Sequence, residues 1–311
     1  MGLKYFTVPF WDITNNLVGE GDMYLPHEIP NARVLISVKT YPLPSNKYDE
    51  LVCTAGFFQD DHDPDNNGKW IRLYPVPFRA LPYNDQYKKF EWVELDLVRN
   101  TSDFRPESYR SIRGIDGIRT LGEEVGTSDG WAKRKEYALK EVFTSMNELI
   151  QRAKSNERKS LATLNPREIV DFVIEKAEPE WKKEWRDHLL QYNLWDLDKR
   201  GEGKVRKVVP KLPFKYSYRF LSDGDEKPRK LMIEDWEIGG LYWNCLRRSG
   251  GDIEEANRLV RKKYFDEFLT KKDLYFFLGT TLQFQLVAPQ PFIIIGVFYP
   301  PKSEAVQLPL L

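Results

Sequence analysis

Apolar and polar residues alternate in four runs between residues 32 and 99, as they do in extended strands. In the first run Val34, Ile36 and Val38 fall on one face, and Leu35, Ser37 and Lys39 fall on the other. This two-residue period is typical of a half-buried strand. Four such runs, separated by turn residues, predict a small β-barrel or a strongly curled sheet. They comprise residues 32–41, 50–58, 70–78 and 90–99.

The next part of the chain predicts a loop and then a helical middle segment. Residues 100–127 have no clean period and are rich in Gly, Ser, Asp and Arg, which indicates a structured loop. Ser128 or Asp129 can cap a helix in which apolar residues recur at three- and four-residue steps as far as Ala153. The sequence Asn165-Pro166-Arg167-Glu168 supplies an N-cap, a first-turn proline and a capping box, and it predicts another helix.

The C-terminal part predicts strands and helices in alternation. A polar, basic stretch at residues 198–211 indicates a linker, and we place a domain boundary near Gly201. Asp252 and Glu255 form a second capping box. The last strand is apolar on both faces and is expected to be central in its sheet. The predicted strands are 214–221, 273–287 and 291–301, with helices after Asp235 and Asp252.

The predicted fold class is α+β. It comprises a small β-barrel-like N-terminal domain at residues 1–127, a helical connector at 128–200 and a C-terminal α/β sheet domain at 201–311.

The order of segments in the second half of the chain resembles a family of bacterial proteins of unknown function. The segments are LATLNPREIVDFVIEKAEPEW, FKYSYRF, IEDWEIGGLYWN, KDLYFFLGTTLQF and FIIIGVFYPP, which cover about residues 160–301. The resemblance implies a bacterial, cytoplasmic setting. It carries over no catalytic or binding residue, because it comes with no established chemistry.

Composition and charge exclude several classes of protein. Of the 311 residues, 41% are hydrophobic and 14% aromatic, which is too much large apolar surface for a disordered chain. The 47 basic and 47 acidic residues leave no net charge, so any attraction to a nucleic acid must be local. Cys53 and Cys245 are isolated, which fits a reducing, cytoplasmic compartment. No stretch approaches 18 uninterrupted apolar residues, so we expect no membrane partner.

The sequence contains no strong catalytic or cofactor-binding motif. It has no phosphate-binding glycine loop, no dinucleotide fingerprint, no zinc-protease motif and no paired C-x-x-C. Asp61, Asp63 and Asp65 alternate like calcium ligands, but Asn66 and Arg72 stand where that motif needs glycine and an acidic residue. We interpret this segment as a solvated hairpin loop, and we expect no bound metal and no cofactor.

A cationic and aromatic strand face gives the main indication of function. Trp70, Arg72 and Tyr74 share one face of the third run, and such a face can stack bases and contact phosphates. Aromatic residues on strands are also typical of a buried core, so that alternative stays open. Our preferred hypothesis is a nucleic-acid-associated protein that binds DNA or RNA. The predicted surface comprises Lys39, Trp70, Arg72, Tyr74, Arg79, Arg105, Arg110, Lys215 and Arg219.

Two basic segments contribute to this surface. Lys215 and Arg219 end a run from Lys199 that contains a single acidic residue, enough local charge to release counterions from a phosphate backbone. A solvated linker explains the run equally well. Arg105 and Arg110 could form a phosphate clamp, or they could pair with acidic residues nearby in the chain.

Two rival functions belong to other classes. Asp235 and Glu237 are candidate catalytic residues of a metal-dependent phosphodiesterase or nuclease, which would require Mg²⁺. Asp235 is also well suited to cap the helix that begins there, and we favour that interpretation. The third hypothesis is a subunit that docks a protein partner through Trp181 and Trp185.

Overall fold

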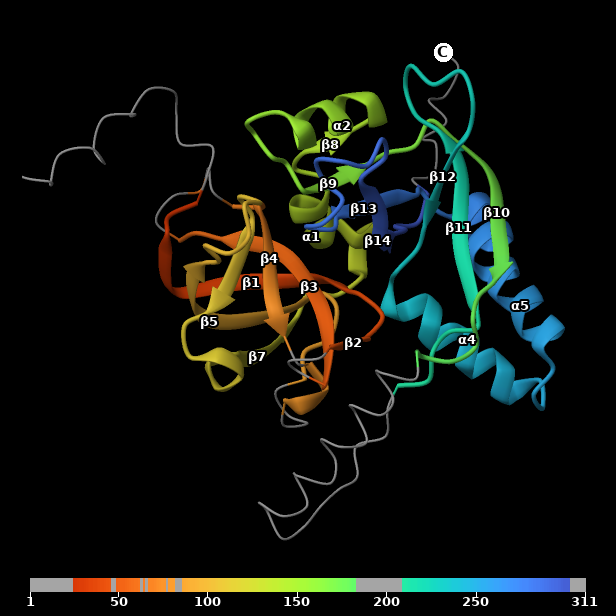
Figure 1. Cartoon of the computed structure of the whole chain (residues 1–311), viewed down its shortest axis with the longest axis horizontal. Coiled ribbons are helices and arrows are strands. Elements are labelled where there is room, and N and C mark those ends of the chain that lie inside the picture. The colour runs from red at the N-terminus through yellow and green to blue at the C-terminus, as the bar shows by residue number, and fades with distance from the viewer. Residues whose placement is uncertain are drawn as a thin grey trace, which may run out of the picture.

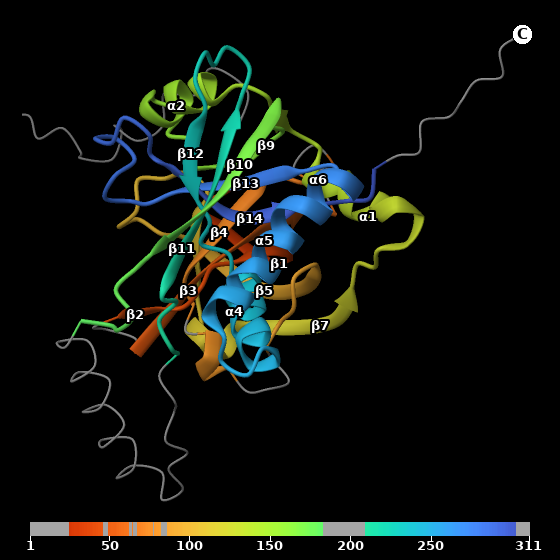
Figure 2. The ribbon, with the colours of Figure 1, turned by 90° about the vertical axis from the view of Figure 1, so that its right-hand side faces the viewer.

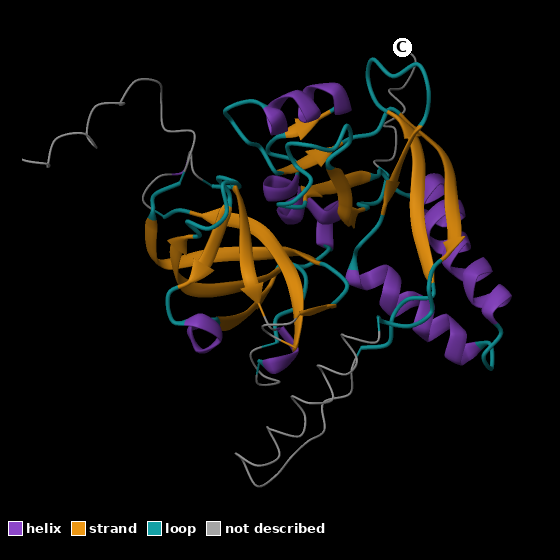
Figure 3. Ribbon diagram, in the orientation of Figure 1, coloured by secondary structure: helices purple, strands orange, loops and turns teal. Residues whose placement is uncertain are grey.

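The chain folds into a β-barrel and a second part built from two sheets and several helices (Figure 1). The computed structural model describes residues 25–45, 49–61, 64, 67–76, 78–81, 86–182 and 209–302. Strands predominate over helices among these residues (Figure 3). The predicted α+β fold class is confirmed.

Five strands close the barrel. The strands of this part are β1 (Glu28–Lys39), β2 (Leu43–Ser45), β3 (Asp49–Gln59), β4 (Trp70–Val76), β5 (Glu91–Arg99), β6 (Ser108–Ser111) and β7 (Arg119–Glu124). The order β1-β3-β4-β6-β5 returns to β1, because β1 also pairs with β5, while β2 and β7 lie outside this ring. All pairs are antiparallel except β4 with β6. The four predicted strands correspond to β1, β3, β4 and β5, so the predicted barrel is confirmed.

The loop predicted at residues 100–127 was wrong, because β6 and β7 lie there with a short 3-10 helix (Gly114–Gly117). β6 joins β4 through Leu73–Tyr109 and β5 through Leu97–Ser111. A strand this short shows no period in sequence. It forms because its backbone groups find partners on two strands at once, and these partners complete the barrel.

A bulge in β1 changes which side chains face the barrel interior. Ile36 pairs with Gly56 and Val38 with Ala55, so Ser37 is an extra residue. A β-carbon at Gly56 would lie 2.3 Å from the Leu35 carbonyl oxygen, so only glycine permits this close approach of β3. Val34 and Ile36 face the barrel interior, but Val38 falls on the opposite side with Leu35. The single apolar face predicted from Val34 to Val38 is therefore wrong, because the bulge reverses the alternation.

Residues 128–182 and 209–302 form two sheets and the helices that cover them. The helices are α1 (Ser128–Ala138), α2 (Met146–Lys154), α4 (Trp236–Arg248), α5 (Ile253–Arg261), a π-helix (Lys262–Glu267) and α6 (Phe268–Lys271). The strands are β8 (Val142–Phe143), β9 (Leu161–Leu164), β10 (Glu168–Lys176), β11 (Phe214–Leu221), β12 (Arg229–Met232), β13 (Tyr275–Thr280) and β14 (Phe292–Phe298). One sheet has the order β14-β13-β9-β8 and the other β10-β11-β12. Figure 2 shows α4 and α5 in front of the sheets, and Tyr216 on β11 contacts Tyr242 on α4.

The predicted helical middle segment needs two corrections. The helix expected to continue as far as Ala153 is divided into α1 and α2, with β8 between them. Its cap was also misplaced, since α1 follows Thr127 and α2 is capped by Ser145, whose side chain accepts a hydrogen bond from the Glu148 amide. The helix predicted from Asn165 was wrong, because the residues after it form strand β10.

The C-terminal predictions are largely confirmed. Strands β11, β13 and β14 form, although β13 ends at Thr280 and the expected strand 273–287 was too long. Asp252 caps α5 as predicted, since its carboxylate accepts the Glu254 and Glu255 amide hydrogens. Trp185, Gly201 and the basic run from Lys199 to 208 lie outside the described residues.

Strand β14 is the end strand of its sheet, not the central strand that was expected. It is nevertheless apolar on both faces because it lies between two cores. Phe292 and Ile294 belong to the core of the C-terminal part. Ile295 and Phe298 belong to a second cluster that includes Leu35, Phe57, Trp70 and Trp92 of the barrel. The barrel and the C-terminal part therefore share a continuous apolar junction.

Candidate nucleic-acid interface

The predicted face of Trp70 and Arg72 points into the junction between the barrel and the C-terminal part. Trp70 is 8% exposed, and its ring centroid lies 5.2 Å from that of Phe277. Arg72 is 4% exposed and donates to the Ser160 hydroxyl at 2.7 Å and to the Ser160 carbonyl at 3.2 Å. Burial and the neighbouring Arg105 lower the pKa of Arg72 to about 10. Arg72 holds the junction together and does not face a solvent-side ligand.

Arg105 has a similar structural role. Its guanidinium is bound to the Asp103 carboxylate and donates to the Thr280 carbonyl at 2.6 Å, and both charged side chains are buried. Burial would raise the pKa of Asp103, but the hydrogen bonds and charge of Arg105 lower it. The expected internal pairing of Arg105 is thus found, and this residue ties the loop before β6 to the end of β13.

The other predicted cations are distributed over separate surfaces. Lys39 donates to the Tyr87 carbonyl at 2.9 Å and lies 4.5 Å from the centre of the Phe78 ring, and burial lowers its pKa to about 8. Arg110 is exposed on β6, while Tyr74 and Arg79 are half-buried. Lys215 and Arg219 are exposed on β11, opposite Glu175 and Asp171 of β10. The structure therefore brings Trp70, Arg72 and Arg105 together, but buried in the junction, and it leaves the other predicted residues on separate surfaces.

Asp235 and Glu237 lie at the start of α4 and bind a lysine. Asp235 caps the helix by accepting the Glu237 amide hydrogen at 3.1 Å. The Lys89 ammonium, 9% exposed, lies 3.1 Å from Asp235 and 3.0 Å from Glu237. The capping alternative for Asp235 is confirmed. Among the residues that the structure describes, no group of three His, Cys, Asp or Glu side chains could hold a metal ion, and no helix is long and apolar enough to cross a membrane.

A cleft of about 430 Å³, here called the junction cleft, lies between the barrel and the C-terminal part. The barrel contributes the start of β4 and the segment before β6. The C-terminal part contributes α2 and the segments on either side of it. Of the predicted nucleic-acid-binding residues, only Trp70 is among the residues that line the junction cleft. The lining residues are Leu25, Asn67, Gly68, Lys69, Trp70, Pro106, Glu107, Tyr109, Lys140, Glu141, Arg152, Glu157, Lys159 and Leu161.

Cationic side chains enter the junction cleft from both parts of the molecule. Lys159 lies 2.9 Å from Glu141, which is 53% exposed, and Arg152 lies 2.9 Å from Glu148 and 3.5 Å from Glu157. Glu107 is already bound, since its carboxylate accepts the Ser160 amide at 2.9 Å and the Ser160 hydroxyl at 2.7 Å. The buried charge of Arg72 lies near it. The lining cations are Lys69, Lys140, Arg152 and Lys159, and the lining acids are Glu107, Glu141 and Glu157.

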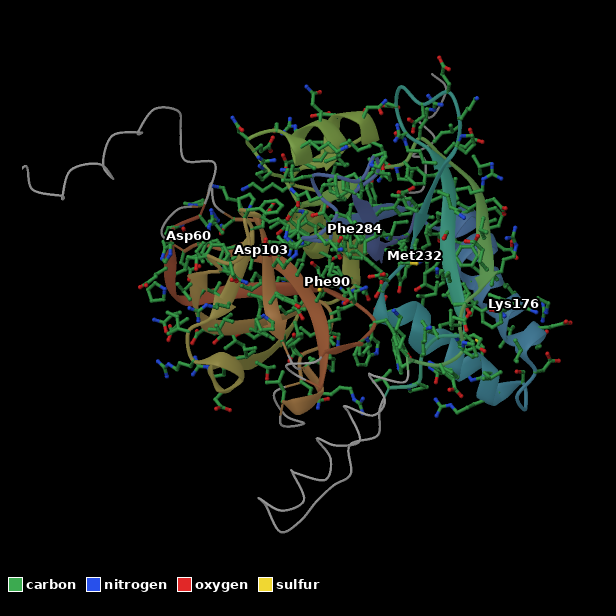
Figure 4. The ribbon with its side chains drawn as sticks, viewed as in Figure 1. Asp60, Phe90, Asp103, Lys176, Met232 and Phe284 are labelled. Atoms are coloured by element: carbon green, nitrogen blue, oxygen red, sulfur yellow. The ribbon has the colours of Figure 1, made fainter. Side chains whose placement is uncertain are left out.

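An exposed apolar loop lies beside this cleft. Residues 281–290, here called the apolar loop, join β13 to β14, and the buried side chain of Gln285 holds them in place. Its amide group donates to the carbonyls of Ala153 and Arg158, at 3.0 and 2.9 Å, and it accepts the Thr280 hydroxyl hydrogen at 2.6 Å. Figure 4 labels Phe284 on this loop. The exposed apolar side chains of the loop are Leu282, Phe284, Leu286 and Val287.

The sequence contains a signal for the apolar loop that the strand prediction missed. No charged residue occurs between Asp273 and Lys302, and this apolar stretch is longer than two strands and a tight turn require. The cations of the junction cleft have no comparable signal. They come from four separate segments, and their convergence depends on how the barrel packs against the C-terminal part.

Comparisons with known proteins identify a family without a known activity. No curated protein matches the chain. One solved structure, the crystal structure of p204 HINb domain, aligns with 8% sequence identity over 89% of this chain and 98% of that chain. Its TM-score of 0.27 is too low to support a statement about fold or function.

Two family models cover most of the chain and meet near residue 141. The model described as Domain of unknown function (DUF8758) matches residues 30–140, and the model described as Domain of unknown function (DUF8757) matches residues 142–310. The expectation of an uncharacterised family over about residues 160–301 is confirmed. Since the second model spans more than half of the sequence, the chain belongs to the family of the DUF8757 domain of unknown function.

Proposed function

We propose that this protein binds nucleic acid through phosphate contacts in the junction cleft. The observation that carries the proposal is that Lys69 of the barrel and Arg152 and Lys159 of the C-terminal part line one cleft. Lysine and arginine contacts to phosphates supply most of the sequence-independent affinity of nucleic-acid-binding proteins. Four cations against three acids leave the cleft lining with a small net positive charge, and a cleft concentrates the field of its charges even in a chain without net charge.

The ion pairs in the cleft are compatible with phosphate binding. Glu141 is 53% exposed, and its bond to Lys159 spans 2.9 Å at the rim. The Lys159 side chain is only 14% exposed, so its charge needs a partner, and a phosphate that takes the place of the Glu141 carboxylate keeps that charge paired. A phosphate that reaches both Arg152 and Lys159 would gain charge-assisted hydrogen bonds from each. Lys140 has a different role, because its ammonium donates to the carbonyls of Pro64 and Asn67 and fixes that turn.

The test is fluorescence anisotropy with labelled DNA and RNA at about 50 and 200 mM salt, the range in which phosphate contacts are visible. Changing Arg152→Gln and Lys159→Gln together removes two cations from the cleft. We expect weaker binding, and a salt dependence whose slope falls by about 1.4, since each contact to a single strand contributes about 0.7.

The matched control is Lys215→Gln with Arg219→Gln. It removes the same charge from the exposed face of β11, and we expect it to leave the affinity and the salt slope nearly unchanged. Absent or salt-insensitive binding at 50 mM would refute the proposal. A larger loss in the control would move the interface to the sheet of β10, β11 and β12.

A further inference from the structure

The geometry points to a single-stranded ligand: we infer that unpaired bases stack on Phe104 and Phe284, two exposed rings beside the junction cleft. This inference rests on the proposed function. Phe104 is 45% exposed and Phe284 49% exposed. Neither residue lines the cleft itself, so the two rings extend the proposed interface from phosphate contacts to contacts with bases.

Phe104 is held in solvent by its two neighbours. Asp103 and Arg105 are both buried and bound to each other, and the Asp103 amide donates to the Asn100 carbonyl at 3.0 Å. Between these two anchored neighbours the Phe104 side chain points outward. The Arg158 guanidinium lies 5.9 Å from the centre of the Phe104 ring, close enough to contact a phosphate next to a stacked base.

Phe284 is presented in the same way. It directly precedes Gln285, which is fully buried and forms three hydrogen bonds, so the apolar loop has a fixed backbone under an exposed ring. The carbonyl that Gln285 binds at 2.9 Å is that of Arg158, the residue that lies over Phe104. Two loops that are separate in sequence therefore carry one exposed ring each. Each ring is next to a buried, hydrogen-bonded polar residue in the chain.

These two loops are joined to each other and to the cleft. Arg105 donates to the Thr280 carbonyl at 2.6 Å, which ties the Phe104 loop to the start of the apolar loop. Arg158 lies between Glu157 and Lys159, which both line the junction cleft. Figure 4 labels Asp103 on the barrel and Phe284 on the C-terminal part. A strand bound to the cations of the cleft would thus meet the segments that carry both rings, because these segments are bonded to each other and to residue 158.

Exposed rings of this kind discriminate between single strands and duplexes. In a duplex each base is already stacked and paired, so a protruding ring finds no free face, whereas unpaired bases offer one. The run from Leu274 to Pro301 is uncharged, so the apolar loop offers a ligand no ionic contact. Its contribution to binding a base is therefore stacking on Phe284. The cations beside the rings favour a nucleic acid, whose phosphates they can bind. A protein partner that docks on the rings through apolar contacts would not require these cations.

The experiment compares a labelled single strand of about 15 nucleotides with its duplex, using the full chain and the variants Phe104→Ala and Phe284→Ala. We expect the wild type to prefer the single strand. Each variant should lose about 5- to 150-fold in affinity for it, because one stacked base contributes about 1–3 kcal/mol. The salt slope should not change, and Phe284→Trp should retain binding. Both rings are exposed, so denaturation midpoints should match that of the wild type.

Val287→Ala is the matched control, since Val287 is 73% exposed on the same loop but is not aromatic. It should bind like the wild type. Equal affinity for duplex and single strand, with no loss in Phe284→Ala, would overturn the inference and leave the proposed function intact. An equal loss in Val287→Ala and Phe284→Ala would also overturn it, because general apolar contact indicates a protein partner. Absent binding of either nucleic acid would refute the proposed function itself.

Discussion

Single polar residues with several hydrogen bonds fix the turns on which this fold depends, and Asp225 is the clearest case. It lies between β11 and β12, where its carboxylate accepts hydrogen bonds from the Ser222 amide and hydroxyl and from the Arg229 guanidinium. Burial would raise the pKa of Asp225, but the hydrogen bonds from Arg229 and Ser222 lower it to about 2. Its ionised form therefore stabilises the folded state.

This pKa shift predicts a specific loss of stability in acid. An Asp in an unfolded chain has a pKa near 3.9, so Asp225 should contribute about 2 kcal/mol at neutral pH, and this contribution should disappear as the pH falls from about 5 to about 2. Urea unfolding should show Asp225→Asn less stable than the wild type at pH 7 but nearly equal at pH 2. Asp223→Asn, exposed in the same turn, should have little effect. A deficit in Asp225→Asn that does not depend on pH would contradict this account.

Residue-scale features were predictable where they are local. The caps at Asp235 and Asp252 were predicted because a capping residue lies within three positions of the amides that it binds. Lys89, the partner of Asp235, lies 146 positions away in the sequence, and nothing near either residue indicates the other. The carboxylates of Asp235 and Glu237 therefore resembled an acidic catalytic pair, although they bind Lys89.

At the scale of elements, β10 shows how pairing overrides local helix signals. The motif from Asn165 to Glu168 matches a helix start, but the residues after it include the β-branched Ile169, Val170, Val173 and Ile174. The strand pairs with β11 from Glu168–Leu221 to Lys176–Phe214. Its inward ring, Phe172, contacts Tyr218 of β11 at a centroid distance of 5.3 Å. Long-range pairing and packing of this kind decide a strand, and sequence spacing alone does not report them.

The π-helix is another element that depends on a distant partner. The Tyr218 hydroxyl of β11 donates to the Tyr264 carbonyl inside it, and both rings are buried. Tyr218→Phe would leave that buried carbonyl without its hydroxyl donor, so we expect a loss of about 1–3 kcal/mol in the free energy of unfolding. Tyr216→Phe is the control, because its hydroxyl binds Asn257 at a partly exposed site where water can substitute. Chemical denaturation should separate the two variants, and equal stability would refute this role of Tyr218.

At the scale of the whole molecule, the sequence predicted a barrel and an α+β C-terminal part but not the junction between them. The junction combines the apolar cluster around Phe57, Trp70 and Phe277 with the buried contacts of Arg72, Arg105 and Lys89. Trp70 and Arg72 were predicted to form a binding surface because alternation in a strand does not reveal which face a second domain covers. The junction cleft and the two exposed rings result from the same packing, so they too could not be predicted from local patterns.

A shared junction of this kind should make the two parts unfold together, with Lys89 as the most sensitive contact. Burial alone would lower the pKa of Lys89, but Asp235 and Glu237 raise it, so the ammonium stays charged within the junction. Lys89→Met would leave the fully buried Asp235 without its counterion, and we expect a loss of about 3–5 kcal/mol in the free energy of unfolding. Lys88→Met is the control, because that side chain is 72% exposed and its pair with Glu124 should contribute under about 1 kcal/mol.

Urea unfolding followed by tryptophan fluorescence and by far-ultraviolet circular dichroism measures both the loss and its cooperativity. The fluorescence reports on tryptophans in both parts, including Trp70 and Trp92 of the barrel and Trp131, Trp236 and Trp243 of the helices, whereas the dichroism reports on secondary structure. If the junction couples the two parts, fluorescence and dichroism should change at one urea midpoint. In Lys89→Met this midpoint should lie at a lower urea concentration and should still be the same for both signals. Two midpoints in the wild type, or a Lys89→Met loss no larger than that of Lys88→Met, would show that the parts are stable independently. The cleft would then lie between two bodies free to move, and a phosphate bound to Lys69 and Lys159 would have to bring them together.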